Sequence, residues 1–393
     1  MKQVQGVILA AGQGTRMLPL TETRSKSMLP IVDPLSDIHP LIEYPVRTME
    51  ALGIDDIYVV VGPFRDQVEE YLRDRVIYRV QEIQKGTADA LRVVRNDIAD
   101  QFLILYGDSL FTSKLTPLVK KRNPTICGYR VSDVSNFEKL IVDNGKLKEI
   151  RLRSGTDGGL VYTGIGLLTP EIFDKLDDVQ ISERGELELM YALYGSSVQR
   201  LNGYWGHVWY PWDYLDVNRH QLSQMKGRRI KGKVESSCEI KGPVHIGEGT
   251  IVHPSTVIEG PVYIGENCEI GPTCYIQPYV TLGNKVKIGN FCEIKNSVVM
   301  DATKIPHLSY VGNSVVGRNC NFGAGTKIQD FNLDGRNIEV MINGQLVDTG
   351  RKDLGAIIGD NVKTTINAAI LAGTRIGFKR RIFPGEILIG DKT

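Results

Sequence analysis

The sequence predicts two domains of different fold class, a parallel α/β sheet domain over residues 1–228 and a parallel β-helix over residues 229–393. Two observations support this division. In the first part, short apolar stretches alternate with segments of helical character, which is typical of a parallel α/β sheet. From residue 234 onward an aliphatic residue recurs every six positions, which is typical of a β-helix built from hexapeptide repeats.

The first domain opens with the apolar stretch GVILAA, which ends at glycines as a buried parallel strand would. Alternating elements follow along the chain. Because ligands of such sheets bind at the carboxyl ends of the strands, the loops after the strands are the expected location of a site. We expect strands over 6–11, 57–61 and 102–106, and helices over 41–52, 65–72 and 88–94.

The six-residue period of the second domain is too long and regular for ordinary β-strands. Each aliphatic residue should point inward and stack on the next coil, and the glycines that follow several of them permit turns. The period is interrupted over 295–315 and 329–357, where we expect loop insertions, the second with a hairpin over 337–347. The positions in register are Val234, Ile240, Ile246, Val252, Ile258, Ile264, Ile270, Ile276, Leu282, Ile288 and Ile294.

Composition places the chain among globular proteins. The 393 residues carry 47 basic and 46 acidic side chains, a net charge of +1, so no bias toward nucleic acid or a membrane surface follows. No apolar run is long enough to span a membrane and the N-terminus has no signal-peptide pattern, so we expect a cytoplasmic protein. The six cysteines form no CxxC pair, which predicts reduced thiols and no zinc ribbon.

The loop after the first strand has the composition of a phosphate-binding loop. Gly12 and Gly14 let backbone amides approach a phosphate, and Arg16 adds a fork of hydrogen-bond donors. Lys26, further along the same segment, supplies a second cation. The loop matches neither the Walker pattern nor the dinucleotide GxGxxG pattern.

Residues 9–30 resemble the signature of the sugar-1-phosphate nucleotidylyltransferases, LAxGxGTRxxPxT followed by KxxxP. The resemblance implies a Rossmann-like nucleotidyltransferase domain in which Arg16 and Lys26 are catalytic. It also implies that the loop binds the nucleotide through Leu9, Ala11, Gly12, Gly14 and Thr15.

Two further segments extend this resemblance. The segment QEIQKGTA (81–88) is similar to the QxxQxGTA element that reads a pyrimidine base in uridylyl and thymidylyl enzymes, which implies UTP or dTTP as substrate. Amide side chains suit uracil because its edge presents both a donor and an acceptor. The residues implied are Gln81, Gln84, Gly86 and Thr87. Asp108, after the strand over 102–106, matches the carboxylate that holds Mg²⁺.

The same family resemblance implies the remaining sugar and metal contacts. Thr163 and Gly164 match a sugar-contacting element, and Glu186 matches the acidic residue that binds a sugar hydroxyl. The second metal carboxylate of the family has no direct counterpart. His207 occupies the aligned place, and Asp213 is the candidate substitute ligand.

The β-helix carries a second set of motifs, HLSYVG (307–312), NFGAGT (321–326) and NLDG (332–335). They resemble the acetyltransferase half of bifunctional glucosamine-1-phosphate acetyltransferase/UDP-N-acetylglucosamine pyrophosphorylases, in the form found in archaea. This resemblance implies a left-handed β-helix, a homotrimer and acetyl-CoA as co-substrate.

Taken alone, His307 would be interpreted as an ordinary loop histidine, but within HLSYVG we expect it to be the catalytic base, because acetyl transfer to an amine needs a proton acceptor that works near neutral pH. Tyr310 is expected to contact the sugar phosphate and Asn321 to orient the acceptor. Asp330 or Asn332 stands at the position of the family's asparagine, depending on the alignment. Lys352 or the adjacent Arg351 is the candidate phosphate-binding cation.

These features predict a bifunctional enzyme that acetylates glucosamine 1-phosphate and joins the product to a uridylyl group from UTP, releasing pyrophosphate. Galactosamine and glucose 1-phosphate remain possible sugars. One alternative is a nucleotidylyltransferase of single activity whose β-helix serves only for oligomerisation. Another is a non-catalytic regulatory subunit, which the intact Arg16, Lys26 and Asp108 argue against.

Overall fold

The computed structural model describes residues 4–35, 37–134, 137–152, 157–183 and 185–393. Contacts between residues group the chain into two compact units. The first comprises Met1–Gln13, Ser25–Leu29 and Pro40–His207, and the second comprises Gly14–Arg24, Pro30–His39 and Val208–Thr393. Because these units are not contiguous along the chain, the division into 1–228 and 229–393 stays a prediction.

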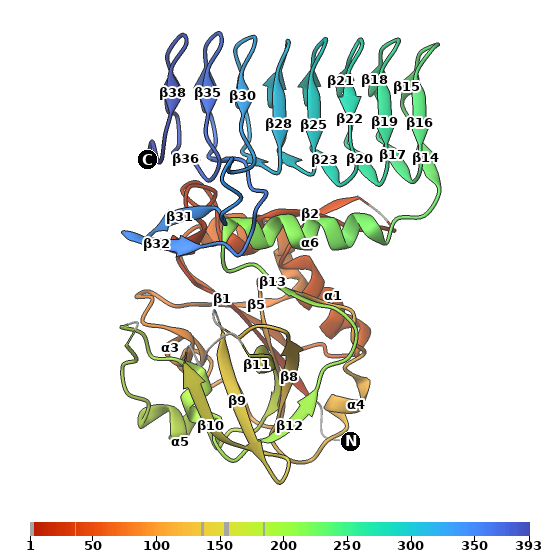
Figure 1. Ribbon diagram of the computed structural model, residues 1–393. Coiled ribbons are helices and arrows are strands. Elements are labelled where there is room, and N and C mark those ends of the chain that lie inside the picture. Colours follow the sequence, from red (N-terminus) through yellow and green to blue (C-terminus); the bar gives the residue numbers. More distant parts are fainter. Residues whose placement is uncertain (1–3, 36, 135–136, 153–156, 184) are drawn as a thin grey trace. The chain divides into compact units, whose positions relative to one another are not determined.

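The first unit is built on a nine-stranded sheet of order β5-β4-β1-β6-β11-β8-β12-β10-β9 (Figure 1). The four strands from β5 to β6 are parallel, and β11 runs antiparallel to β6. The strands are β1 (Gln5–Ala10), β4 (Ile57–Val61), β5 (Ile77–Val80), β6 (Phe102–Tyr106), β8 (Thr125–Val131), β9 (Glu138–Asp143), β10 (Lys146–Leu152), β11 (Gly159–Leu168) and β12 (Ser197–Arg200). Strands β7 (Ser109–Phe111) and β13 (Trp205–His207) form a separate pair.

The first unit contains the helices α1 (Glu43–Ala51), α2 (Arg65–Leu72), α3 (Thr87–Arg92), α4 (Thr116–Val119) and α5 (Ile172–Asp177). Three of them, α1 to α3, agree with the helical segments expected from the sequence, and α4 and α5 were not expected. Successive residues of β1 enter different cores, since Val7 and Leu9 pack in one cluster and Ile8 in another. Both faces of the parallel strands are therefore buried, which explains why they are apolar throughout rather than alternating.

The carboxyl end of β1 is closely flanked by two glycines from neighbouring strands. A side chain at Gly62, after β4, would place its Cβ 2.3 Å from the carbonyl oxygen of Ala11. One at Gly107, after β6, would lie 3.0 Å from the Cβ of Ala10. The absence of side chains at these two positions lets the three strand ends come together, at the edge where ligands of such sheets bind.

The second unit contains a three-sided parallel β-helix, because the chain visits three parallel sheets in turn. We call these sheets the first, second and third faces. The first face contains β14 (Arg228–Ile230), β17 (Val244–Ile246), β20 (Val262–Ile264), β23 (Val280–Leu282), β26 (Val298–Val299), β29 (Val315–Val316), β33 (Ile357–Ile358) and β36 (Arg375–Ile376). Figure 1 shows the coils in a row, from β14 to β38.

The second face contains β15 (Lys233–Val234), β18 (Ile251–Val252), β21 (Glu269–Ile270), β24 (Lys287–Ile288) and β27 (Lys304–Ile305). It continues through bridges at Asn321 to the pair β34 (Lys363–Thr364) and β37 (Arg381–Ile382). The third face contains β16 (Glu239–Lys241), β19 (Val257–Glu259), β22 (Tyr275–Ile276), β25 (Glu293–Lys295), β28 (Tyr310–Gly312), β30 (Lys327–Ile328), β35 (Ala369–Ile370) and β38 (Ile387–Leu388).

The six-residue period has a direct structural meaning. Ile246 pairs with Ile264 and Ile264 with Leu282, so one coil consists of three hexapeptides, one for each face. The inward aliphatic residues of all three faces form one continuous buried cluster. Each coil therefore buries its apolar row only against its neighbours, as expected of a solenoid.

The expectation of a loop insertion over 295–315 is wrong. These residues form an ordinary coil that includes β26, β27 and β28, and Ile294 pairs directly with Val311 of the next coil. The period breaks because this coil is one residue shorter than those before it, not because residues leave it. The second interruption does hold an insertion, with the hairpin of β31 (Glu339–Ile342) and β32 (Gln345–Asp348) close to the predicted 337–347.

The second unit also contains helix α6 (Pro211–Ser223) and the short strands β2 (Pro30–Val32) and β3 (Ile38–Pro40). Gln221 donates a 2.9 Å hydrogen bond to the carbonyl oxygen of Val32, which ties the helix to β2. Within the described ranges, no helix combines the length and apolar character needed to cross a membrane.

Candidate functional site

A predicted catalytic residue and the predicted metal ligand contact each other directly in the first unit. The ammonium group of Lys26 forms an ion pair with the carboxylate of Asp108. Asp108 follows β6, whose end is held to β1 by a 2.9 Å hydrogen bond from the Gly107 amide to the Leu9 carbonyl oxygen. The side chains keep 22% and 13% exposure, so both charges remain accessible to a ligand.

The two glutamines in the segment 81–88 differ in burial and in their hydrogen-bond partners. Gln81 is buried, and its amide nitrogen donates to the carboxylate of Asp89 (2.8 Å) and to the carbonyl oxygen of Gly86 (3.2 Å). Gln84 is only partly buried, and its carbonyl accepts a 3.4 Å hydrogen bond from Gln13. Gln81 thus braces the turn, and base binding by Gln84, whose amide nitrogen donates to the Gln81 carbonyl oxygen (2.7 Å), stays a prediction.

The turn is also tied to the segment that contains Glu186. The amide of Leu187 donates to the Lys85 carbonyl oxygen (2.7 Å), and the hydroxyl of Thr87 accepts from the Leu189 amide (2.8 Å). Gly86 has a φ of 118°, and a Cβ there would lie 2.5 Å from the carbonyl oxygen of Leu187, so only glycine fits. The side chain of Glu186 itself is exposed.

Thr163 and Gly164 lie at an irregularity in β11, where pairing with β8 shifts between Tyr162 and Gly166. Gly164 has a φ of 75°, and a Cβ would lie 2.5 Å from the ring of Tyr106, which explains the glycine. The buried hydroxyl of Thr163 donates to the carbonyl oxygen of Cys127 (2.9 Å). Sugar binding by Thr163 therefore gains no support from its side chain and stays a prediction.

The loop that carries Arg16 belongs by its contacts to the second unit. Gly14 has left-handed backbone (φ 68°) and precedes a single 3-10 turn, Thr15–Met17. The hydroxyl of Thr21 donates a 2.8 Å hydrogen bond to the Gly14 carbonyl oxygen, which closes the loop. Arg16 is half-buried on this loop.

The candidate second metal ligand has a different task in the structure. The carboxylate of Asp213 accepts hydrogen bonds from the amides of Trp209 (3.0 Å) and Tyr210 (2.8 Å) and so caps the start of α6. The ring of His207 stacks on Trp205 at 5.0 Å. Among the residues that the structure describes, no three His, Cys, Asp or Glu side chains group as a metal site. Metal binding at Asp213 stays a prediction without structural support.

In the β-helix, HLSYVG and NFGAGT occupy successive coils. The amide of Gly325 donates a 3.0 Å hydrogen bond to the carbonyl oxygen of His307, and Lys327 donates to that of Leu308. The exposed imidazole of His307 lies at the corner between the second and third faces. Its Nδ1 is 2.5 Å from the amide oxygen of Asn290, one coil earlier.

Asn290 is a candidate residue that the sequence analysis missed. An amide oxygen only accepts, so it holds the proton on Nδ1 and leaves the lone pair of His307 on Nε2. The spacing could have revealed this contact, because Asn290 precedes His307 by the length of one shortened coil and therefore lies beside it in the neighbouring coil.

Tyr310 and Asp330 lie together in a buried polar cluster. Asp330 is 4% exposed and accepts hydrogen bonds from Tyr310 (3.1 Å) and Asn313 (2.6 Å), while Lys295 approaches its carboxylate at 3.6 Å. Burial, followed by the charge and hydrogen bond of Asp330, raises the pKa of Tyr310. The Asp330 carboxylate positions its neighbours, and its negative charge makes it a poor direct partner for a phosphate.

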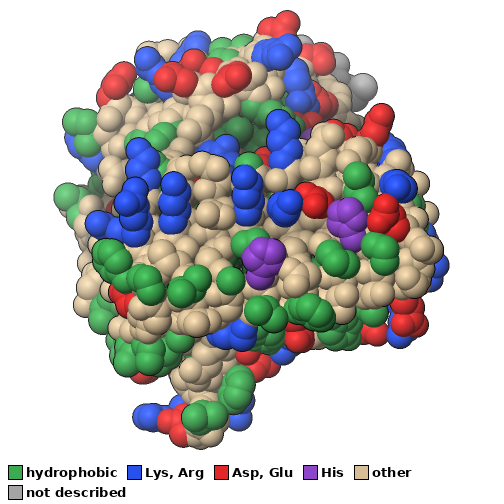
Figure 2. Space-filling model, turned by 90° about the horizontal axis from the view of Figure 1, so that it is seen from above, with side chains coloured by type: hydrophobic (Ala, Val, Ile, Leu, Met, Phe, Trp, Pro, Cys, Tyr) green, Lys and Arg blue, Asp and Glu red, His purple; other side chains and the backbone are tan. Residues whose placement is uncertain are grey.

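Asn321 lies between two lysines on the outward side of the second face. It forms bridges with Lys304 on one side and Lys363 on the other, and Arg381 pairs with Lys363 one coil further. All of these side chains are exposed. Figure 2 shows basic side chains gathered in a row on one surface of the molecule. The sequence analysis did not select these lysines, which only the stacking of coils brings together.

The remaining predicted acetyl-site residues lie in the insertion after β30. Asn332 donates to the carbonyl oxygens of Arg336 (3.4 Å) and Asn337 (3.3 Å) and so stabilises a turn. Lys352 is exposed, and Arg351 forms an ion pair with Asp216 of α6. No described contact joins Lys352 to His307, and its role stays a prediction.

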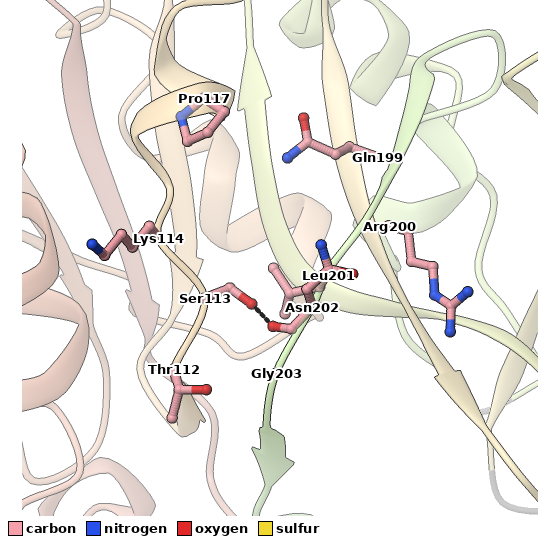
Figure 3. Close-up of a pocket in the computed structure, with 9 residues that line it drawn as sticks. All are labelled: Thr112, Ser113, Lys114, Pro117, Gln199, Arg200, Leu201, Asn202 and Gly203. Carbon is pink, nitrogen blue, oxygen red and sulfur yellow. Dashed lines mark hydrogen bonds between the residues drawn. The ribbon is translucent and has the colours of Figure 1, made fainter.

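A surface pocket in the first unit coincides with none of the predicted residues (Figure 3). It is lined by Thr112–Lys114, Pro117 and Gln199–Gly203. The hydroxyl of Ser113 donates to the carbonyl oxygen of Asn202 across it. Because the residues that line it include none of the predicted catalytic or binding residues, we assign it no function.

Family models match segments in both halves of the chain. Residues 5–132 match the family model described as nucleotidyl transferase, and residues 258–374 match the model described as GMPPB C-terminal domain. A crystal structure described as a putative glucose-1-phosphate thymidylyltransferase from Bacillus anthracis matches 56% of this chain and 95% of its own, with 25% identity and a TM-score of 0.50.

Two curated relatives match over nearly the full length. A bifunctional sugar-1-phosphate nucleotidylyltransferase/acetyltransferase from Sulfurisphaera tokodaii is 38% identical over 99% of this chain and 98% of its own. The bifunctional protein GlmU from Methanococcus maripaludis is 42% identical over 95% of this chain and 92% of its own. The chain therefore belongs to the family of bifunctional sugar-1-phosphate nucleotidylyltransferase/acetyltransferases.

Proposed function

We propose that the protein catalyses two steps of UDP-N-acetylglucosamine synthesis, acetylation of glucosamine 1-phosphate and uridylyl transfer from UTP to the acetylated sugar phosphate. The observation that carries the first chemistry is the ion pair of Lys26 and Asp108 beside the carboxyl end of β1. The observation that supports acetyl transfer is the contact between the imidazole of His307 and the side chain of Asn290, which orients it. The full-length relatives support both.

In the nucleotidylyl reaction, a phosphate oxygen of the sugar phosphate attacks the α-phosphorus of UTP, and pyrophosphate leaves. Lys26 would hold the attacking phosphate, while Arg16 and the amides of Gly12 and Gly14 would bind the triphosphate. A carboxylate at a strand end, completed by substrate phosphates, is a common Mg²⁺ donor set, and the accessible Asp108 fits it. Bound Mg²⁺ would neutralise charge on the reacting phosphates.

In the acetyl reaction, the amine nitrogen of the sugar attacks the carbonyl carbon of the acetyl thioester. An amide bond forms, the carbon–sulfur bond breaks, and coenzyme A leaves as the thiol. Nε2 of His307 accepts the proton that the amine loses and returns a proton to the departing sulfur. Asn290 keeps Nδ1 protonated, so that Nε2 is the nitrogen that takes up and releases the proton.

The anionic substrates of this second reaction require cations near His307. Lys304 and Lys363, on either side of Asn321, would bind the phosphate of the sugar or of coenzyme A, since exposed ammonium groups lose little hydration there. This arrangement favours Lys304 and Lys363 over Lys352 as the phosphate-binding cations.

We further propose that the β-helix is left-handed and that three copies assemble as a homotrimer in the cytoplasm. The support is the hexapeptide period, which the family resemblance associates with that handedness and assembly. Light scattering should then give three times the chain mass of 43.7 kDa. A monomer at micromolar concentration would contradict the trimer.

One experiment tests both activities. The protein is incubated with UTP, Mg²⁺, glucosamine 1-phosphate and acetyl-CoA, and pyrophosphate and free thiol are assayed separately. We expect both products, with thiol release preceding pyrophosphate release. Pyrophosphate without thiol would indicate a single-activity nucleotidylyltransferase, and neither product would indicate a regulatory subunit. Replacing UTP by dTTP, and the sugar by galactosamine or glucose 1-phosphate, defines the preference.

A further inference from the structure

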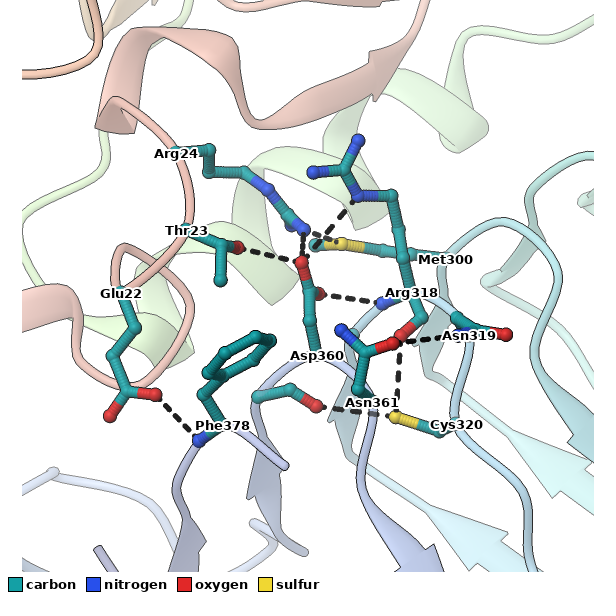
Figure 4. Close-up of polar contacts among 12 residues, drawn as sticks. Glu22, Thr23, Arg24, Met300, Arg318, Asn319, Cys320, Asp360, Asn361 and Phe378 are labelled. Atoms are coloured by element: carbon teal, nitrogen blue, oxygen red, sulfur yellow. Dashed lines mark hydrogen bonds and ion pairs between the residues drawn. The ribbon is translucent and has the colours of Figure 1, made fainter. Parts of the chain in front are cut away.

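The loop Gly14–Arg24, which carries Arg16, is held by residues of the β-helix (Figure 4). The carboxylate of Asp360 forms a buried ion pair with Arg24 and accepts a 2.7 Å hydrogen bond from the hydroxyl of Thr23. The side chains of Arg24 and Asp360 are only 3% and 5% exposed. A charge pair at this depth fixes the groups it joins, because neither charge can be left unpaired there.

Further contacts hold the same loop along its length. The amide of Phe378 donates a 2.5 Å hydrogen bond to the carboxylate of Glu22, and Arg375 donates to the carbonyl oxygen of Leu18 at 3.4 Å. At the start of the loop, Asn343 in the tip of the β31–β32 hairpin donates to the hydroxyl of Thr15 at 3.4 Å. The loop is thus anchored on successive coils and on the insertion.

One oxygen of Asp360 makes a contact that recurs along the β-helix. At the corner after the first face, the side-chain oxygen of one coil accepts from a backbone amide of the preceding coil. Asn284 accepts from Glu266, Asp301 from Asn284, and Asp360 from Arg318, at 2.7–2.8 Å. In Asp360 this is the task of Oδ1, as it is in the other two residues.

The second oxygen of Asp360 contacts the loop as well as one arginine of the β-helix. Oδ2 contacts Thr23 and Arg24, with the guanidinium of Arg318 at 3.6 Å. Asn284 shows that an asparagine performs the corner task as well as an aspartate does. The contact that recurs at this corner therefore does not itself need a negative charge at position 360, and the charge of Asp360 faces Arg24 of the loop and Arg318 of the β-helix.

We propose that Asp360 is a positioning residue for nucleotidylyl transfer, acting through Arg24 to hold the loop that presents Gly14, Thr15 and Arg16 to the triphosphate. The inference rests on the proposed function of that loop. It assigns to the β-helix an indirect, positioning part in the first reaction, besides acetyl transfer. Asp360 follows β33, at the corner between the first and second faces, whereas His307 lies at the corner between the second and third faces.

The test is Asp360→Asn in the full chain, with Asp301→Asn as the matched control at an equivalent corner. A displacement of about 1 Å in a reacting group can cost roughly 10²-fold in rate. We therefore expect kcat/KM for pyrophosphate release to fall about 10-fold to 100-fold in Asp360→Asn, with a raised KM for UTP. Thiol release should stay within about twofold, and Asp301→Asn should change neither activity.

A double-mutant cycle with Arg24→Met establishes that Asp360 acts through Arg24. If it does, the double variant Arg24→Met/Asp360→Asn should release pyrophosphate at least as fast as the less active of the two single variants, because both changes remove the same interaction. Additive losses would overturn the proposal, as would unchanged pyrophosphate release in Asp360→Asn. Parallel loss of both activities with a lowered melting temperature would also overturn it, by showing a structural role. Absence of pyrophosphate release from the wild-type protein would instead contradict the proposed function itself.

Discussion

Lys26 and Asp108 form an ion pair although they lie far apart in the sequence. Lys26 lies in a short 3-10 turn, Lys26–Met28, and Asp108 lies beyond the end of β6. The pair places a cation and a carboxylate in contact at the carboxyl ends of the strands, the edge where ligands of such sheets generally bind. Substrate phosphates would therefore meet the cation, and a metal ion the carboxylate, at one point.

Removing either member of this pair should abolish pyrophosphate release. We expect Lys26→Met and Asp108→Asn each to lower kcat by at least about 10²-fold, the usual cost of losing one stabilising group at a reacting phosphate or carbonyl. Thiol release provides the control, because the acetyl motifs lie on the β-helix. A variant that keeps most of its pyrophosphate release would remove that residue from the mechanism.

Gln81 and Gln84 should respond differently to substitution. Gln84→Ala should raise KM for UTP and leave kcat nearly unchanged, since a base contact contributes equally to the ground and transition states. Gln81→Ala leaves the Asp89 and Gly86 acceptors without their donor, so it should lower the unfolding free energy by about 1–3 kcal/mol. Initial rates and melting curves measure the two effects. The reverse pattern would show that Gln81 reads the base.

The imidazole of His307 and the amide of Asn290 should contribute unequally to acetyl transfer. His307→Ala should cut thiol release by roughly 10²–10⁴-fold, the range for a general base. Asn290→Ala should cost only roughly fivefold, corresponding to one hydrogen bond of about 1 kcal/mol. Pyrophosphate release from acetylated substrate should be unchanged in both. Retention of more than about a tenth of the wild-type rate by His307→Ala would place the base elsewhere.

The ion pair of Asp360 should appear in the acid stability of the protein. Burial alone would raise the pKa of Asp360, but the charge of Arg24 and hydrogen bonds from Thr23 and the Arg318 amide outweigh it, and the pKa is lowered. A lowered pKa contributes stability above the unfolded value of about 3.9, and this stability is lost as pH falls through the folded pKa.

The difference in melting temperature between the wild type and Asp360→Asn should accordingly be largest near neutral pH. It should shrink as pH falls below the unfolded value of about 3.9, because the unfolded chain then binds a proton that the folded carboxylate, with its lowered pKa, binds only at lower pH. Melting curves at a series of pH values measure this directly. A difference that stays constant down to about pH 3 would show that the charge of Asp360 does not stabilise the fold.

The sequence by itself determined the two fold classes and most of the local elements. The strands over 57–61 and 102–106 and the helix over 65–72 follow from local apolar patterns, because their residues are buried in regular alternation or in continuous runs. The β-helix followed from one period, since every coil repeats the same contact with its neighbour. The sequence analysis interpreted the shortened coil after Ile294 as an insertion, because a break in the period does not show whether a coil has lost a residue or gained a loop.

Only the tertiary structure decided which residues meet. Lys26 contacts Asp108, Asn290 contacts His307, and Lys304 and Lys363 flank Asn321 through strand ends and coil stacking that no local pattern reveals. It also showed that Gln81 and Asp213 are engaged in bracing a turn and capping a helix. The assignment of Asp360 to the loop of Arg24 depended on a contact between opposite ends of the sequence. A sequence fixes the chemistry of each side chain, whereas packing decides which of its hydrogen-bonding atoms remain for a substrate.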